Sequence, residues 1–130
     1  MRQDIINYLS AQNLGTYRVS TELPFDDNGT PLYLKNVKRI YVDSEDTAQD
    51  AVIATLDGVN IERETTTIRV YFASDAKNLP SNYDTVVNAV KSSRDVTTIS
   101  GVSSRTSSVT KTYEQDLLVS EFEIQFTKLT

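Results

Sequence analysis

The stretch LLVSEFEIQFTKL at Leu117–Leu129 constrains the fold of this chain most, because apolar and polar side chains alternate along it. Two sets of residues interleave here, the apolar Leu118, Phe122, Ile124 and Phe126 and the polar Glu121, Glu123 and Gln125. Alternation with a period of two places the sets on opposite faces of a β-strand. We predict a closing strand with one face in the core and one face in water.

A second alternating segment, TTTIRVYF at 65–72, has the apolar residues Ile68, Val70 and Phe72 on one face. It follows the pair Asp57-Gly58, a preferred turn for a hairpin, so residues 51–75 are predicted to form a β-hairpin. Earlier in the chain LYL at 32–34 and VKRIYVD at 37–43 are strand-like, and SEDTAQD at 44–50 reads as a polar connection. Asn28-Gly29 before Pro31 predicts a tight turn.

Helical spacing occurs twice. Residues 2–14 place Ile5, Ile6 and Leu9 on one face, and Gly15 stands where a helix would stop. A later segment begins at Pro80–Asn82 and has apolar residues at helical spacing, namely Tyr83, Val86, Val87 and Val90. Three of these are valines, so packing on the sheet must stabilise this helix.

The expected fold class is α+β, a mostly antiparallel sheet with two helices packed on one face, in a single domain spanning residues 1–130. A chain of 130 residues is long enough for one sizeable core. No internal repeat and no domain boundary is visible in the sequence.

The composition excludes several functions. The chain has no cysteine and no histidine, which removes disulfides, thiolate or imidazole metal ligation and histidine acid–base catalysis. Its net charge of −5 argues against nucleic-acid binding. The acidic clusters FDDN, DSED and IERE lie in turn-like or exposed segments, so we expect them to be solvated rather than catalytic. We therefore predict no enzyme activity, no cofactor and no metal site.

Neither a membrane span nor a secretory signal is predicted. No apolar run approaches the roughly 18–20 residues that cross a bilayer. The first residues, MRQDIINYLSAQN, lack an apolar signal core, so a cytoplasmic origin is the simplest expectation.

The stretch GVSSRTSSVTKTYEQD at Gly101–Asp116 leaves two interpretations open. Its serine and threonine content suits a mobile loop. Its threonine, valine and tyrosine content also suits a strand or hairpin arm beside the closing strand, completed by a neighbouring subunit.

The order of segments resembles the tail terminator proteins of long-tailed bacteriophages, the group of the lambda-like minor tail protein that caps the tail tube. The resemblance rests on four segments in order: the N-terminal helix MRQDIINYLSAQN, the strands of VKRIYVDSEDTAQDAVIATLDG, the strand-to-helix stretch TTTIRVYFASDAKNLPSNYDTVVNAVKSS, and the late polar segment leading into LVSEFEIQFTKL. It covers nearly the whole chain in architecture and includes no signature residue.

The resemblance implies a structural virion protein at the head-proximal end of the tail. Such a protein forms a ring, a homo-hexamer, that stops polymerisation of the major tail tube protein and presents a surface to the head-completion or connector protein. Polar, turn-forming or β-capable residues are then the candidates for subunit or tube contacts: Asp26, Asp27, Asn28, Asp57, Glu62, Glu64, Arg105, Val109, Lys111 and Tyr113. The alternatives are a head–tail connector or neck protein and a monomeric protein-binding module.

Overall fold

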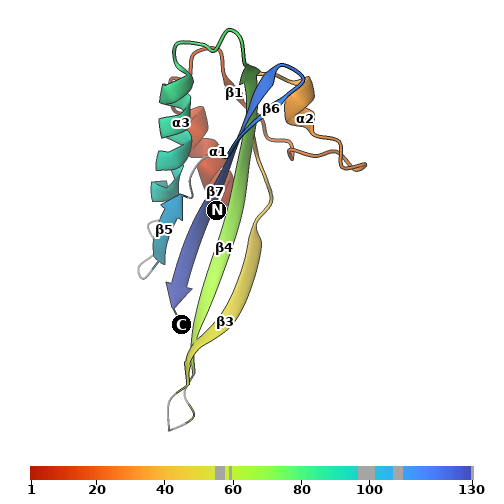
Figure 1. Ribbon diagram of the computed structural model, residues 1–130. Coiled ribbons are helices and arrows are strands. Elements are labelled where there is room, and N and C mark those ends of the chain that lie inside the picture. Colours follow the sequence, from red (N-terminus) through yellow and green to blue (C-terminus); the bar gives the residue numbers. More distant parts are fainter. Residues whose placement is uncertain (55–57, 59, 97–101, 107–109, 130) are drawn as a thin grey trace.

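The chain folds around one long, twisted sheet whose two longer helices lie against one face (Figure 1). The computed structural model describes residues 1–54, 58, 60–96, 102–106 and 110–129. In chain order its elements are α1 (Arg2–Ser10), β1 (Arg18–Val19), α2 (Leu32–Lys35), β2 (Arg39–Val42), β3 (Asp46–Ala54), β4 (Asn60–Asp75), α3 (Tyr83–Ser92), the 3-10 turn η1 (Ser93–Val96), β5 (Val102–Thr106), β6 (Thr110–Glu114) and β7 (Leu117–Leu129).

The two longest strands, β4 and β7, form the centre of the sheet. They pair antiparallel from Arg63 opposite Leu129 to Asp75 opposite Leu117. The main strand order is β1-β2-β4-β7-β5, with β3 also on β4 and β6 also on β7. Among the described strands the pairings are antiparallel except for the short β1–β2 pair. The predicted α+β class and mostly antiparallel sheet are confirmed.

The core lies between the sheet and the helices α1 and α3. The apolar face predicted for β7 is buried, and so is the apolar face of β4. The residues predicted for the two helices complete this core: Ile5, Ile6 and Leu9 from α1 and Tyr83, Val86, Val87 and Val90 from α3. Burial of these side chains stabilises α3 despite its valine content.

The sheet also has a third, short helix that the sequence did not predict. Residues 32–34 were expected to be a strand, but Leu32–Lys35 form α2. Pro31 precedes this helix with extended backbone, and Tyr33 stacks on Tyr71 of β4 with ring centroids 5.1 Å apart. This aromatic contact holds α2 against the sheet face opposite α1 and α3.

The polar connection predicted at 44–50 is also wrong from Asp46 onward. Residues 46–50 form the first half of β3, paired with Arg63–Thr67 of β4. Their side chains are exposed, so no hydrophobic alternation marks the strand and backbone pairing with β4 supports it. The predicted hairpin of 51–75 is confirmed in its two strands, while Asp57 lies outside the described residues.

The Ser/Thr-rich stretch 101–116 contributes two strands. Residues 102–106 and 110–114 form β5 and β6, and both pair with β7 of the same chain. A mobile loop is therefore wrong for these residues, and the predicted placement of strands beside the closing strand is confirmed, while completion by a neighbouring subunit stays a prediction. Gln115 and Asp116 have φ of 52° and 63°, which gives the tight β6–β7 turn the twist that a two-residue hairpin loop needs.

The predicted helix stop at Gly15 was wrong, because α1 already ends at Ser10. Gly15 has a φ of 63°, and a Cβ built on it would lie 2.6 Å from Asn82 Nδ2, which donates to Leu14 O. We expect Gly15→Ala to lower the free energy of unfolding by more than the roughly 1–2 kcal/mol of backbone strain at positive φ, because its Cβ would also displace Asn82. Urea unfolding measures the change, with Gly29→Ala as a second positive-φ site whose Cβ meets no atom within 4 Å. An equal loss at both sites would contradict a role for the contact with Asn82.

Candidate functional site

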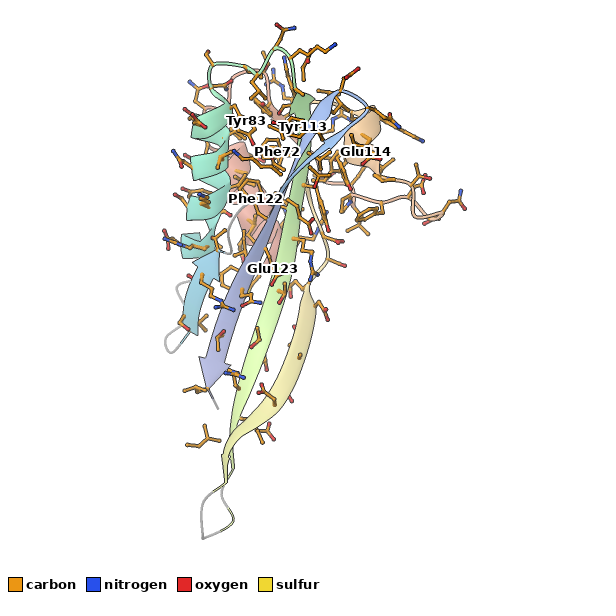
Figure 2. The ribbon with its side chains drawn as sticks, viewed as in Figure 1. Phe72, Tyr83, Tyr113, Glu114, Phe122 and Glu123 are labelled. Atoms are coloured by element: carbon orange, nitrogen blue, oxygen red, sulfur yellow. The ribbon has the colours of Figure 1, made fainter. Side chains whose placement is uncertain are left out.

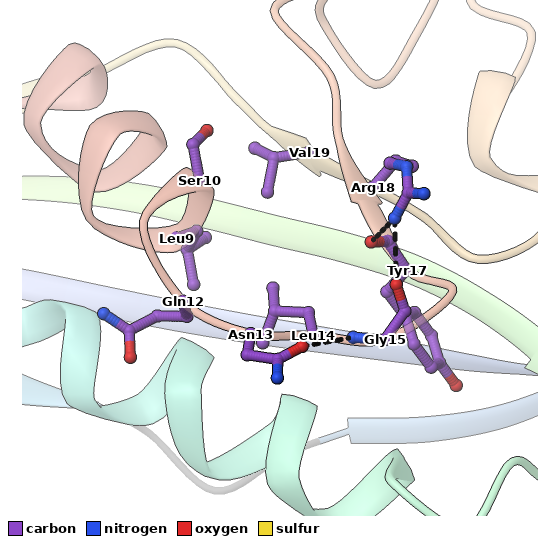
Figure 3. Close-up of a pocket in the computed structure, with 9 residues that line it drawn as sticks. All are labelled: Leu9, Ser10, Gln12, Asn13, Leu14, Gly15, Tyr17, Arg18 and Val19. Carbon is purple, nitrogen blue, oxygen red and sulfur yellow. Dashed lines mark hydrogen bonds between the residues drawn. The ribbon is translucent and has the colours of Figure 1, made fainter.

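A pocket beside the end of α1 is formed almost entirely by one continuous segment (Figure 3). It measures about 300 Å³ and is bordered by residues between Leu9 and Val19. The guanidinium of Arg18 is already paired there, since its Nη1 donates to Gly15 O at 2.9 Å and to Tyr17 O at 3.2 Å. The charged group of this pocket thus stabilises its own loop.

No group of metal-ligating acidic side chains is present in the part of the chain that the structure describes. The described helices also include none that is long and apolar enough to cross a membrane.

The candidate residues Asp26, Asp27 and Asn28 lie in the loop between β1 and α2. Oδ1 of Asp26 accepts hydrogen bonds from Asn28 N at 2.9 Å and Thr30 N at 2.8 Å. These bonds form the turn predicted at Asn28-Gly29, with Gly29 at a φ of 77°. Figure 1 shows this loop next to α2, on the side away from α3.

Asp26 is expected to titrate below the ordinary aspartate range. The N–H of Thr30, followed by the N–H of Asn28 and the charge of Lys35, stabilises the carboxylate and lowers the pKa of Asp26 from 3.8. With a depressed folded pKa, the stabilisation is complete above the unfolded value and is lost as pH falls through the folded pKa. An NMR titration of the Asp26 carboxyl carbon, repeated in urea, measures both values. A folded pKa at or above the urea value would contradict the proposed hydrogen bonds.

The remaining candidates lie on two sides of the central strand pair. Glu62 and Glu64 belong to β4 in the long β3–β4 hairpin, where Gln49 Nε2 donates to Glu64 Oε2 at 3.1 Å. Arg105 is on β5, and Lys111 and Tyr113 are on β6. Asp57 and Val109 lie outside the described residues. The structure therefore gathers the candidates into three separate places.

The two candidates on β6, Tyr113 and Lys111, differ in their surroundings. The Tyr113 side chain is 73% exposed, and Figure 2 labels it on the β6 ribbon together with Glu114. Lys111 is anchored, because its Nζ lies 5.4 Å from the centre of the Tyr83 ring on α3.

The sheet face opposite α1 and α3, here called the free face, combines residues that the sequence analysis selected with others that it did not. By strand register it comprises Asp46, Ala48 and Asp50 of β3, Arg63, Thr65, Thr67, Arg69 and Tyr71 of β4, Glu121, Glu123, Gln125 and Thr127 of β7, and Ser103 and Arg105 of β5. The alternation in 117–129 predicts the exposed side of β7, and Arg105 was a candidate. Only the strand pairing places them beside the residues of β3 and β4, which no local sequence signal identifies.

Charged and amide side chains on the free face pair with one another, mostly across neighbouring strands. Arg63 donates two hydrogen bonds to the Asp50 carboxylate, from Nη2 to Oδ2 at 2.8 Å and from Nε to Oδ1 at 3.3 Å. Arg69 lies 3.4 Å from Glu123 and 4.0 Å from Glu121. Arg105 Nε donates to Gln125 Oε1 at 2.8 Å, and Gln125 Nε2 donates to Glu123 Oε1 at 2.8 Å. These contacts set the positions of the polar groups along the face.

Aromatic side chains cover the free face toward α2. Tyr71 contacts the ring of Tyr33 and, edge to face, the ring of Phe25 at 5.5 Å. Burial under these rings is the main cause that raises the pKa of Tyr71 to about 12, with the nearby Glu121 and Asp43 adding to it. The open part of the face thus lies away from α2, over β3, β5 and the lower half of the central strands (Figure 1).

A shallow hollow of about 470 Å³ lies in this open part. Hydrogen-bond donors or hydroxyl groups line it throughout, and they come from three adjacent strands: Arg63, Thr65, Ser103, Arg105, Gln125 and Thr127. Its chemistry suits an incoming carboxylate or another acceptor rather than an apolar ligand.

Two edge strands of the sheet, β3 and β5, are further open features; among the described strands β1 and β6 also pair on one side only. Strand β3 pairs only with β4, and strand β5 only with β7, within the described chain. Each edge therefore has backbone groups on its outer side for which no strand partner is present.

No protein-family model matches this chain, and a search of curated proteins finds no significant match.

Proposed function

We propose that this protein is a structural subunit that assembles as a ring on the end of a phage tail tube. The ring stops addition of tube subunits and provides the surface for head attachment. The order of segments resembles that of tail terminators and suggests this particular assembly. The geometry of the sheet supports association between subunits.

The observation that carries the proposal is that one sheet has open edges on opposite sides. Strands β3 and β5 lie at these edges, separated by β4 and β7. A subunit with two different open edges can join copies head to tail, and such contacts close into rings when the rotation between copies closes. The pocket beside α1 is bordered by one segment and the hollow on the free face is shallow and polar, so neither competes with the open edges as a site for a protein partner.

The β3–β4 hairpin adds a contact element. It extends well past α1 and α3 at one end of the molecule (Figure 1). Its described side chains from Asp46 to Ala51 and at Glu62 and Arg63 are exposed. An arm without a core of its own suits contact with a tube or a neighbouring subunit.

A tube-capping assay tests the proposal. The purified chain is added to its cognate tail tube protein during polymerisation, and tube lengths and ends are recorded by negative-stain electron microscopy. We expect shorter tubes with a six-fold ring at one end. An acidic protein of similar size serves as the control, because net charge alone should not cap a tube.

Tubes of unchanged length without end density would contradict the proposal. Rings that bind the head-side connector but not the tube would favour the neck-protein alternative. A chain that stays monomeric with tube protein present and binds a peptide would favour a binding module.

A further inference from the structure

The two open edges of the sheet carry opposite charge. Within its first five residues β3 has Asp46 and Asp50 and no basic residue. Strand β5 has Arg105 and no acidic residue. Two β3 edges would repel each other, and so would two β5 edges, whereas a β3 edge and a β5 edge attract.

The strand directions decide how the two edges could meet. Strand β3 is antiparallel to β4, β4 to β7, and β7 to β5. Strand β3 therefore runs opposite to β5 within one chain. If a second copy continues the sheet without reversing it, its β5 lies antiparallel to β3 of the first copy.

The faces of the two edge strands decide which side chains would meet. Asp46 and Asp50 lie on the free face of β3, and Arg105 lies on the free face of β5. In a continuous sheet, residues directly opposite each other share a face. Arg105 of one copy can then lie opposite Ala48, diagonally between Asp46 and Asp50 of the next.

The lengths of the two edges match. The register of β3 on β4 is regular from Asp46 to Ala51 and shifts before Ile53, which limits the straight part of this edge. Strand β5 spans five residues, Val102–Thr106. It is held in place, because Val102 packs against the core and Thr106 Oγ1 donates to Lys91 O at 3.0 Å.

Asp46 and Arg105 remain available for a neighbour, while Asp50 is already paired with Arg63 of its own chain. Within the described chain Asp46 has no side-chain hydrogen bond or ion pair, and Arg105 uses only Nε, leaving its terminal nitrogens unpaired. Arg105 also borders the donor-lined hollow of the free face. A carboxylate arriving from a neighbouring β3 would meet this guanidinium and the hydroxyl of Ser103.

We propose that β3 of one copy pairs antiparallel with β5 of the next copy, with Arg105 between Asp46 and Asp50, so that the sheets of adjacent subunits join. This inference rests on the proposed ring and names its subunit contact. The unlike charges of the edges explain why the contact is head to tail rather than two-fold.

Cysteine cross-linking tests the pairing directly, because the native chain has no cysteine. Ser104→Cys is combined in turn with Thr47→Cys, Gln49→Cys or Ala51→Cys, which all lie on the helix-side face of β3. The matched controls combine Ser104→Cys with Ala48→Cys or Asp50→Cys on the free face. We expect an intersubunit disulfide in assembled rings at Gln49, and little or none in the controls, because the geometry of a disulfide requires close Cβ atoms.

Charge exchange tests the energetics. Asp46→Arg and Arg105→Asp should each weaken assembly on the order of tenfold in the association constant, since each places like charges side by side. The combined variant should recover most of the loss. Asn88→Arg on the exposed side of α3 is the control, and sedimentation velocity and thermal melting report assembly and folding separately.

The outcomes separate this inference from the proposed function. One outcome would overturn the β3–β5 contact alone: rings still cap the tube, but Ser104→Cys cross-links no better to Gln49→Cys than to the free-face controls, and the combined charge variant does not recover assembly. Failure of the wild-type chain to form rings with or without the tube would overturn both. Cross-links of β3 to the tube protein instead of β5 would assign that edge to the tube.

Discussion

Phe72→Ala is expected to lower the free energy of unfolding by about 3–5 kcal/mol, the range for truncating a large aromatic side chain in a core. Phe72 is fully buried in the C-terminal part of β4. Its ring packs edge to face on Tyr17 at 5.5 Å and stacks on Phe122 of β7 at 5.7 Å. Figure 2 shows Phe72 between the sheet and the helices with Phe122 nearby. Urea unfolding followed by circular dichroism measures the loss.

The large loss of stability is expected because Phe72 contacts three different parts of the structure. It contacts the loop after α1 through Tyr17, β7 through Phe122 and α3 through Tyr83, whose ring centre is 6.0 Å away. A cavity at this point removes dispersion contacts from all three at once. Leu79→Ala, at a side chain that is 43% exposed, serves as the control and should change stability by less than about 0.5 kcal/mol. Similar losses for both variants would contradict the packing described for the core.

The core could be predicted from the sequence because its pattern is local. Alternation in 65–72 and 117–129 and helical spacing in 83–90 correspond to β4, β7 and α3. In each segment one face is buried by contacts that the whole segment shares, so the period of apolar residues records the secondary structure.

The elements that sequence reasoning missed are those without such a period. The first half of β3 has both faces exposed and depends on hydrogen bonds to β4. Helix α2 spans only four residues and is held by the Tyr33–Tyr71 stack, a contact between distant parts of the chain. The β6–β7 turn uses Gln115-Asp116, whose positive φ values lack the glycine that usually marks such turns.

The candidate contact surface was harder still to predict, because it depends on strand order. Arg105 was selected from its polar surroundings, whereas Asp46, Asp50, Arg63 and Arg69 were not. Their importance appears only when register places them on one face and at opposite edges. The same alternation of apolar and polar residues is compatible with several strand orders. The sequence pattern therefore does not indicate which strands lie at the edges of the sheet.

Ser120→Ala is expected to lower the free energy of unfolding by about 1–3 kcal/mol, because it leaves a buried hydroxyl without a partner. Ser120 is fully buried in β7, and its Oγ lies 2.7 Å from the hydroxyl of Tyr83 at the start of α3. Tyr83 itself is 6% exposed, so water cannot readily replace the serine. The loss arises from desolvation of the Tyr83 hydroxyl more than from the removed hydrogen bond itself.

The partner variant distinguishes this cause from simple loss of packing. Tyr83→Phe keeps the ring and its contact with the Lys111 ammonium, and removes only the hydroxyl. In the double variant Ser120→Ala/Tyr83→Phe neither polar atom remains, so the total loss should be smaller than the sum of the single losses. Urea unfolding of all four proteins gives the coupling, and losses that add within about 0.3–0.5 kcal/mol would show that the two hydroxyls act independently. A clear coupling would identify this buried pair as the polar contact that aligns α3 with β7.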